Sequence, residues 1–294
     1  MATLSQWVQG ARPRTLPAAV APVLVGTGAA YALGRSDTAF ALLAVLVALA
    51  LQVGVNYAND YSDGIRGTDG ERVGPVRLVG QGLANPGNVK FAAMFSFSSA
   101  ALFGLTLVAL SEAFVMLLVG AASIAAAWYY TGGKRPYGYY GLGEVFVFVF
   151  FGLVATLGTT YTQARILSVA SIAGAVGVGA IATAILVANN LRDIPTDRSH
   201  AKLTLAVRLG DTRTRALYAA LLAVALGCVL VAGVIHPTAL VALLSYVLAF
   251  PLLRRVLSGA VGKDLIPVLT RTGQFELLYA ALLAIGLGAA RHVG

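Results

Sequence analysis

Long apolar runs separated by short polar connections dominate this chain. The runs lie at about 15–33, 38–58, 91–110, 113–131, 139–161, 168–190, 216–235, 238–253 and 275–290. Each is roughly 16–23 residues long, which is close to the length of a helix that crosses a bilayer core. The runs do not alternate between apolar and polar residues, as the strands of a membrane barrel would. The pattern therefore predicts an all-α polytopic membrane protein with about nine transmembrane helices in one bundle.

The composition excludes a water-soluble domain. Hydrophobic residues make up 58% of the 294 residues, charged residues only 11%, and the mean hydropathy is +0.81. Soluble globular chains carry about 25% charged residues. No connection is long enough to form a separate domain, so we expect a single transmembrane domain over residues 1–294. The lone cysteine, Cys228, falls within an apolar run and predicts no disulfide framework.

The basic residues gather on one side of the predicted membrane. Of the 21 Lys and Arg residues, 18 fall at the N-terminus or in the connections after every second run, and only Arg35, Arg165 and Arg291 fall on the other side. The positive-inside rule therefore predicts a cytoplasmic N-terminus and an external C-terminus. This arrangement also accounts for the net charge of +9, so no nucleic-acid partner is expected.

Two acidic motifs end the second and sixth runs, four predicted helices apart. The first motif is Asn59-Asp60-Tyr61-Ser62-Asp63, followed by Asp69, and the second is Arg192-Asp193-Ile194-Pro195-Thr196-Asp197. Carboxylates are costly near lipid, so a chain that keeps them there generally uses them. Oxygen-bearing side chains are the ligands of hard cations such as Mg²⁺. The candidate metal ligands are Asn59, Asp60, Asp63, Asp69, Asp193 and Asp197.

Each motif also has a simpler interpretation. Asn, Asp and Ser are common where a helix ends in a turn, and Pro195 would mark the end of a regular helix. Arg192 and Arg198 could simply neutralise the second motif. The two motifs stand at matching positions, however, and a bundle of similar four-helix halves would bring them together at one mouth. Taken together, they favour a metal site that binds a diphosphate.

Several other polar residues on the predicted cytoplasmic side are candidates for substrate binding. A diphosphate needs basic side chains beside the metal ion. The candidates are Arg66, Arg77, Lys134, Arg135, Arg192, Arg198 and Lys202. Any one of them could instead be a topology-setting charge. Asn189 and Asn190 would either extend the metal shell or cap the helix, and most of the clustered tyrosines fit an interfacial belt, with Tyr130 a candidate for lining a pocket.

These motifs resemble the intramembrane aromatic prenyltransferases of the UbiA-type superfamily, whose members carry an N-D-x-x-D motif after helix two and a D-x-x-x-D motif after helix six. Stretches that resemble the menaquinone branch are Arg12-Pro13-Arg14-Thr15-Leu16-Pro17, Gly74-Pro75-Val76-Arg77-Leu78-Val79, Tyr130-Thr131-Gly132-Gly133, Gly141-Leu142-Gly143-Glu144, Asn189-Asn190-Leu191-Arg192-Asp193 and Lys202-Leu203-Thr204-Leu205-Ala206. Gly80-Gln81-Gly82 departs from the pattern, since a Ser is expected before the last Gly. The resemblance covers essentially the whole chain.

The resemblance implies a Mg²⁺-dependent enzyme of the bacterial cytoplasmic membrane that joins polyprenyl diphosphate to 1,4-dihydroxy-2-naphthoate. Mg²⁺ would be held by Asn59, Asp63, Asp193 and Asp197, with Asp60 and Asp69 nearby. Loss of diphosphate, ring attack and loss of CO₂ would give demethylmenaquinol. The implied catalytic residues are Asp63, Asp193, Asp197 and Lys202, and Arg14 or Arg12 could meet the naphthoate carboxylate.

Two alternatives remain at this stage. A different aromatic acceptor, such as 4-hydroxybenzoate, is compatible with the same motifs. A cation-coupled transporter would also use paired acidic residues, but transporters usually place their coupling sites at the bilayer midplane. We find no carboxylate at the centre of a predicted span, and Glu144, near the start of the fifth, comes closest.

Overall fold

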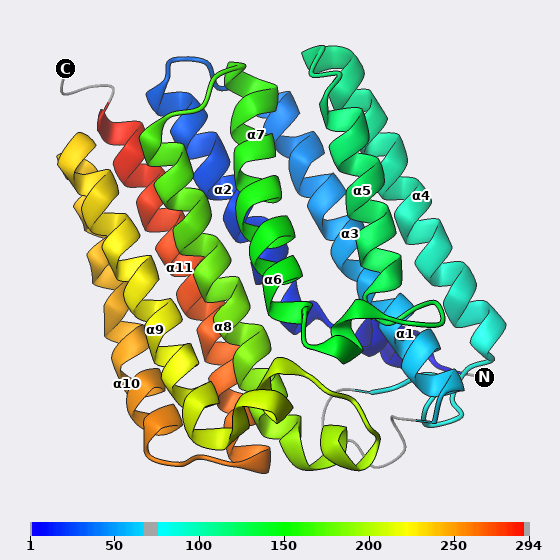
Figure 1. The fold of residues 1–294 in the computed structure, drawn as a ribbon. Helices are drawn as coiled ribbons and strands as arrows, with labels where there is room; N and C mark the ends of the chain where they lie inside the picture. Colours follow the sequence, from blue (N-terminus) through cyan, green and yellow to red (C-terminus); the bar gives the residue numbers. More distant parts are fainter. Residues whose placement is uncertain (1, 68–75, 291–294) are drawn as a thin grey trace.

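The computed structural model describes residues 2–67 and 76–290, and within these ranges every regular element is helical. In chain order, the first elements are α1 (Leu4–Gly10), η1 (Pro13–Thr15), α2 (Pro17–Ala32), α3 (Thr38–Ile65), α4 (Pro86–Ser111) and α5 (Met116–Tyr129). They are followed by η2 (Tyr137–Tyr140), α6 (Gly143–Val147), η3 (Phe148–Val154), α7 (Ala155–Ala164), α8 (Val169–Ser199), α9 (Leu205–Ile235), η4 (Pro237–Ser245), α10 (Tyr246–Leu257), η5 (Gly262–Leu265) and α11 (Ile266–Ala289). The long helices lie side by side in one bundle (Figure 1).

The described helices have the length and composition of membrane spans. Seven are long and apolar enough to cross a bilayer, and the bent pair Leu4–Thr15 and Pro17–Ala32 would make an eighth. The helix α5 is shorter, at 14 residues. The predicted all-helical membrane bundle is confirmed, whereas the count of nine spans stays a prediction.

Three helix boundaries differ from those expected. The helix α3 continues to Ile65, so the first acidic motif lies inside it. The helix α8 continues through Pro195 to Ser199, so the simpler interpretation, in which Pro195 marks the end of a regular helix, is wrong. The helix α11 begins at Ile266 instead of near residue 275, which places the fully buried Glu276 in its middle. The expectation that no span carries a central carboxylate is therefore wrong for α11.

The bundle has one densely packed part built on small residues. The largest core cluster joins side chains of α2, α8, α9, α10 and α11. Backbones approach closely in and beside this core: a Cβ built on Gly28 would lie 2.6 Å from the Cα of Ala284, and one built on Gly152 of η3 would lie 2.5 Å from the Cα of Gly179 on α8. Small residues permit such contacts between helices in lipid. This part of the bundle is therefore tightly packed.

A second, smaller core joins α3 and α4 to the segment that follows α3. Its buried members include Tyr57, Leu78 and Phe97, and Trp7 of α1 packs against it. The span Gly143–Ala164 lies beside α8, and its stretch Phe148–Val154 is a π-helix. Such wider turns are rare and occur frequently at functional sites.

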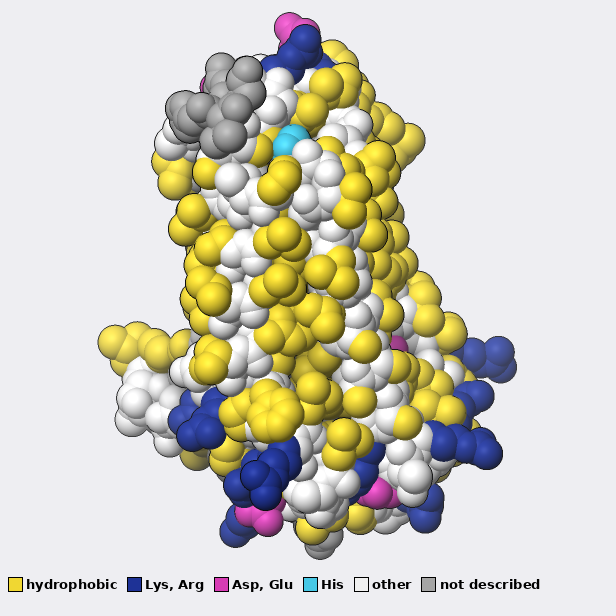
Figure 2. Space-filling view, turned by 90° about the vertical axis from the view of Figure 1, so that its left-hand side faces the viewer, with side chains coloured by type: hydrophobic (Ala, Val, Ile, Leu, Met, Phe, Trp, Pro, Cys, Tyr) yellow, Lys and Arg dark blue, Asp and Glu magenta, His cyan; other side chains and the backbone are white. Residues whose placement is uncertain are grey.

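The surface has the pattern of a membrane protein. On the face that Figure 2 shows, hydrophobic side chains cover the middle of the bundle, and Lys and Arg side chains gather mainly at one end. Among the exposed apolar side chains are Leu118, Val234 and Phe250. Apolar surface of this extent suits contact with lipid tails.

Candidate active site

A cavity of about 900 Å³ opens within the bundle. Its walls come from α2, α3, α4, α5, the span Gly143–Ala164, α8 and α11. Most of the wall is apolar, with side chains such as Leu51, Leu105 and Phe151. Polar side chains gather at the end where α3 and α8 carry the two acidic motifs. The space therefore combines an apolar body with a charged mouth.

A polar stripe on α3 leads along the cavity to the first motif. Gln52, Asn56, Asn59 and Asp63 all line the cavity, and their spacing of three or four residues puts them on one face of the helix. The amide nitrogens of Gln52 and Asn56 donate to the Thr15 hydroxyl at 2.8 and 3.0 Å. The sequence interpretation missed Gln52 and Asn56, although their helical spacing upstream of Asn59 could have indicated them.

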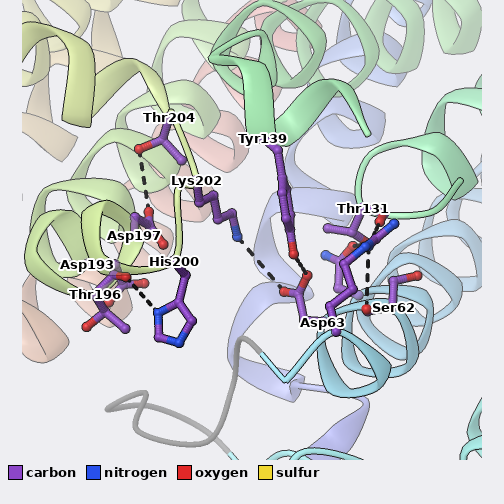
Figure 3. Close-up of polar contacts among 12 residues, drawn as sticks. Ser62, Asp63, Thr131, Tyr139, Asp193, Thr196, Asp197, His200, Lys202 and Thr204 are labelled. Atoms are coloured by element: carbon purple, nitrogen blue, oxygen red, sulfur yellow. Dashed lines mark hydrogen bonds and ion pairs between the residues drawn. The ribbon is translucent and has the colours of Figure 1, made fainter. Parts of the chain in front are cut away.

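Asp63 lies at the centre of the polar mouth, where side chains from three segments meet (Figure 3). The Tyr139 hydroxyl donates to Oδ1 of Asp63 at 2.6 Å, and the ammonium group of Lys202 lies 4.0 Å from Oδ2. Lys202 also lies over the Tyr139 ring, 4.6 Å from its centroid. Lys202 follows α8 in the chain, so this contact connects the ends of α8 and α3. Tyr139 is a further site residue that the sequence interpretation left among the interfacial tyrosines.

The other two residues of the first motif have different surroundings. Asn59 lines the cavity, and its Oδ1 accepts a hydrogen bond from the Thr131 hydroxyl at 2.8 Å. Asp60 is fully buried, and its two oxygens accept hydrogen bonds from the backbone amides of Leu78 and Val79 at 2.7 and 3.0 Å. Asp60 thus ties α3 to the segment that carries Arg77, and it is not among the residues that line the cavity.

The second motif is enclosed by its neighbours on α8 and by Thr204, the N-cap residue of α9. Arg192 binds Asp193 through two hydrogen bonds, of 2.6 and 2.7 Å, and also donates to the Asn189 side-chain oxygen at 2.9 Å. The Thr204 hydroxyl lies 3.4 Å from Oδ2 of Asp197. Arg192 and Thr204 line the cavity, whereas the two aspartates, 3% and 4% exposed, do not. Figure 3 shows these aspartates on the other side of Lys202 from Asp63.

The six predicted metal ligands do not form one cluster. Within residues 2–67 and 76–290, no group of three Asp, Glu, His or Cys side chains is placed to hold a single metal ion. Asp69 lies outside the described residues. The remaining predicted ligands form two groups, one on α3 and one on α8, with Lys202 reaching between them.

The predicted basic residues separate into three groups. Lys202, Arg192, Arg14 and the buried Arg77 line the cavity. Arg66 instead binds the backbone carbonyls of Thr131 and Gly133, which ties the end of α3 to the loop after α5. The exposed residues are Lys134, Arg135 and Arg198, and none of them lines the cavity.

An aromatic wall faces the cavity beside the polar mouth. Its members are Tyr130, Tyr137, Phe146 and Phe150. The rings of Tyr137 and Phe146 are stacked with centroids 3.9 Å apart, and Tyr130 meets Tyr137 edge-on at 5.5 Å. Tyr137 lies outside the spans, and burial raises the pKa of its phenol, so it stays protonated. A flat aromatic molecule would find matching surfaces here.

Comparison with known proteins agrees with this architecture. The model of the UbiA prenyltransferase family matches residues 19–265. Two similar proteins are the 1,4-dihydroxy-2-naphthoate octaprenyltransferases of Mycobacterium tuberculosis and Escherichia coli. The first is 56% identical over 97% of this chain and 97% of its own length, and the second is 40% identical over 96% and 94%.

A solved structure shares the fold at low sequence identity. It is a UbiA homolog from Archaeoglobus fulgidus bound to DMAPP and Mg²⁺, and it is 15% identical with a TM-score of 0.62, over 97% of this chain and 99% of the other. The family match covers most of the chain, and the resemblance noted from the acidic motifs is confirmed. This chain belongs to the UbiA prenyltransferase family.

Proposed function

We propose that this protein transfers a polyprenyl group from polyprenyl diphosphate to 1,4-dihydroxy-2-naphthoate, with loss of diphosphate and CO₂, to give demethylmenaquinol. The observation that carries the proposal is a cavity that combines a charged mouth with an apolar body. A polyprenyl diphosphate has the same division between a charged head and an apolar chain. The acceptor follows from the relatives at 56% and 40% identity, whose names state prenyl transfer to this naphthoate.

The apolar body of the cavity suits the prenyl chain. Side chains of α3, α4 and α5, including Leu51, Leu105 and Leu117, line it away from the polar mouth. Burying a methylene group there is favourable by about 0.8 kcal/mol relative to water. The chain of the substrate would therefore point away from Asp63, and its diphosphate would lie between α3 and α8.

The donor groups at the mouth fit a hard divalent cation. Asn59 and Asp63 would hold Mg²⁺ from α3, and Asp193 and Asp197 would hold it from α8, because carboxylate and amide oxygens are its usual ligands. Lys202 and Arg192 already place positive charge at Asp63 and Asp193. Arg192 occupies one lone pair on each oxygen of Asp193, so a cation there would bind through the remaining lone pairs. When bound, Mg²⁺ would supply positive charge to the diphosphate oxygens as the allylic C–O bond breaks.

The basic side chains at the mouth neutralise the departing diphosphate. Lys202, Arg192 and Arg77 all line the cavity, and charge placed in such a partly dry site acts more strongly than in water. The hydrogen bonds of Asp60 to backbone amides assign it the role of holding the segment that carries Arg77. In this proposal Asp60 is therefore an anchor instead of a metal ligand.

The aromatic wall orients the acceptor. Stacking against Tyr137 and Phe146 would hold the naphthalene ring beside the allylic carbon. The ring carbon that bears the carboxylate attacks the allylic carbon, and the new C–C bond replaces the C–O bond. Loss of the carboxylate as CO₂ then returns its electron pair to the ring and restores aromaticity. The apolar lining of the cavity would keep water, which could capture the allylic cation, away from the reacting carbon.

The proposed site faces the cytoplasm of a bacterial cell. The segregation of Lys and Arg predicts that the mouth and the N-terminus lie on the cytoplasmic side of the membrane. A diphosphate with a membrane-dissolved tail would reach such a mouth from the bilayer.

The test is turnover by the purified protein in detergent or lipid. Polyprenyl diphosphate is supplied with either 1,4-dihydroxy-2-naphthoate or 4-hydroxybenzoate, and the prenylated products are separated by mass. We expect prenylated product and CO₂ from the naphthoate, only when a divalent cation is present, and no product from 4-hydroxybenzoate. Full activity in excess chelator would contradict the role of the metal ion, and preferential prenylation of 4-hydroxybenzoate would contradict the acceptor.

A further inference from the structure

A buried carboxyl group stands directly behind the cavity wall, and the proposed chemistry makes no use of it. Glu144, at the start of α6, is 5% exposed, and its Oε1 accepts a hydrogen bond from the side-chain nitrogen of Asn190 at 2.9 Å. Its other oxygen, Oε2, is buried without a hydrogen-bond partner in the described part of the chain. A buried carboxyl group with so few partners is costly. It therefore calls for a reason other than stability.

Asn190 connects this carboxyl group to the cavity. Asn190 is 6% exposed and lines the cavity, whereas Glu144 does not. Neighbouring Asn189 turns instead to Arg192 and Asp193 at the diphosphate end. The two asparagines of α8 thus serve different parts of the site.

The hydrogen bond to Glu144 determines which way the Asn190 amide points. Because Oε1 of Glu144 accepts this hydrogen bond, the NH₂ group of Asn190 faces it. The amide oxygen Oδ1 is then left as the outward atom of a side chain that lines the cavity. No described residue donates a hydrogen bond to Oδ1. The cavity wall therefore presents a fixed hydrogen-bond acceptor at this point.

A fixed acceptor suits a hydroxyl group and not a phosphate. Diphosphate oxygens are themselves acceptors, and the cationic groups that suit them, Lys202 and Arg192, stand elsewhere on the mouth. Glu144 instead adjoins the aromatic wall: a Cβ built on Gly143 would lie 3.3 Å from the Tyr130 ring, and Phe146 follows two residues later. The dihydroxynaphthoate acceptor carries two hydroxyl donors on a flat ring.

We propose that Glu144 is a positioning residue that fixes the Asn190 amide so that its Oδ1 accepts a hydrogen bond from a ring hydroxyl of the aromatic acceptor. The inference rests on the proposed prenyl transfer and deepens it, because it assigns part of the acceptor's recognition to a pair that carries no formal role in the metal site.

The test begins with Glu144→Gln, which keeps the shape but offers the Asn190 side chain a donor as well as an acceptor. The Asn190 amide is then free to reverse and to present its NH₂ group to the cavity. We expect the KM for 1,4-dihydroxy-2-naphthoate to rise roughly tenfold, the effect of one hydrogen bond, while the KM for polyprenyl diphosphate stays unchanged. Glu276→Gln, which neutralises a buried carboxyl group outside the cavity, is the matched control and should change neither constant.

Two further measurements separate this role from a structural one. The double variant Glu144→Gln/Asn190→Asp pairs the new amide with a new carboxylate, whose second oxygen again accepts from the cavity, so the KM for the acceptor should return toward the wild-type value. Binding of 1-hydroxy-2-naphthoate and 4-hydroxy-2-naphthoate is measured as competitive inhibition. Glu144→Gln should weaken the inhibitor that keeps the contacted hydroxyl and leave the other unchanged.

An unchanged KM for the acceptor in Glu144→Gln, equal weakening of both inhibitors, or no recovery in the double variant would overturn the inference. If Glu144→Gln does not yield folded protein, Asn190→Ala carries the same inhibitor comparison, because it removes Oδ1 directly. These results are read beside the wild-type enzyme. If the wild-type protein prenylates the naphthoate and the variants match it in acceptor KM and inhibitor binding, only the role of Glu144 is refuted. Absence of turnover in the wild-type protein refutes the proposed function.

Discussion

A substitution of Asp60 tests whether this residue of the first acidic motif binds the metal ion or anchors the segment that carries Arg77. The sequence placed Asp60 among the metal ligands, but its two oxygens accept hydrogen bonds from the backbone amides of Leu78 and Val79. If these bonds are its main role, Asp60→Asn should lower the stability of the protein. It should leave the concentration of Mg²⁺ needed for activity unchanged.

The structure sets the size of the effect. An asparagine retains one acceptor oxygen and turns an NH₂ group toward the other backbone amide, so one of the two hydrogen bonds is lost. A hydrogen bond to a charged group contributes about 1.5–3 kcal/mol, and a buried donor left unsatisfied costs a similar amount. Neutralising a buried charge recovers part of this loss. We expect a net destabilisation of about 3 kcal/mol, or roughly 6 °C in Tm for a chain of this size.

The assay combines thermal unfolding in detergent with a Mg²⁺ titration of prenyl transfer at a temperature where both proteins are folded. Asp63→Asn is the converse variant, because Asp63 lines the cavity and contacts Tyr139 and Lys202. It should abolish turnover while lowering the Tm by much less. An Asp60→Asn variant with wild-type Tm and a raised Mg²⁺ requirement would refute the anchor role and return Asp60 to the metal ligands.

Three further outcomes are expected. Gly152→Val should destabilise the protein by about 1–3 kcal/mol in the same unfolding assay, because its Cβ would meet the backbone of Gly179; a wild-type Tm would contradict the close contact of the two helices. Reporter fusions should place the N-terminus in the cytoplasm and the C-terminus outside, and two ends on one side would show that the spans are miscounted. A label on the carboxyl carbon of the naphthoate should leave as CO₂, and its retention in the product would rule out the decarboxylative route but not prenyl transfer.

The helical architecture could be predicted from the sequence because only a few backbone structures can span a lipid bilayer. Apolar runs of span length can satisfy their backbone only as helices once a barrel is excluded. The boundaries were harder, since hydropathy marks where lipid contact ends and not where the helix ends. Asp63 in the last turns of α3 and Asp197 in those of α8 are buried inside the protein, so polar residues continue the helix there. For the same reason hydropathy missed the polar first turns of α11, so Glu276 was not recognised as a residue in the middle of this helix.

The site was accessible only in part. Fixed spacing identified the acidic motifs, because residues four apart share a helix face. Tertiary contacts decide the partners, and no spacing foretells them: Asp60 binds amides 18 and 19 residues away, and Asn190 reaches a carboxyl group 46 residues away. Arg66 shows the same limit, since its charge suggested a phosphate and the structure gives it two backbone carbonyls.

The π-helical stretch Phe148–Val154 sets the rotational phase of the span that contains it. Five residues at strict four-residue intervals all line the cavity: Phe146, Phe150, Val154, Gly158 and Thr162. In a uniform α-helix each such step advances by about 40°, so the fifth residue would have turned roughly 160° away from the first. The wider π turn holds more residues and offsets this drift.

Chain length is therefore constrained here more tightly than residue identity. Inserting one residue into 155–157, in the ordinary helix after the π turn, would rotate everything after it by about 100°. That rotation would withdraw Gly158 and Thr162 from the cavity and break the hydrogen bond from Thr160 to the carbonyl of Gly26 on α2. A change of one apolar side chain for another would alter only the local shape. In variation among such chains, this span should exchange residues freely and admit no insertion. It should lose a residue only together with the π turn, whereas the connections on either side can change in length.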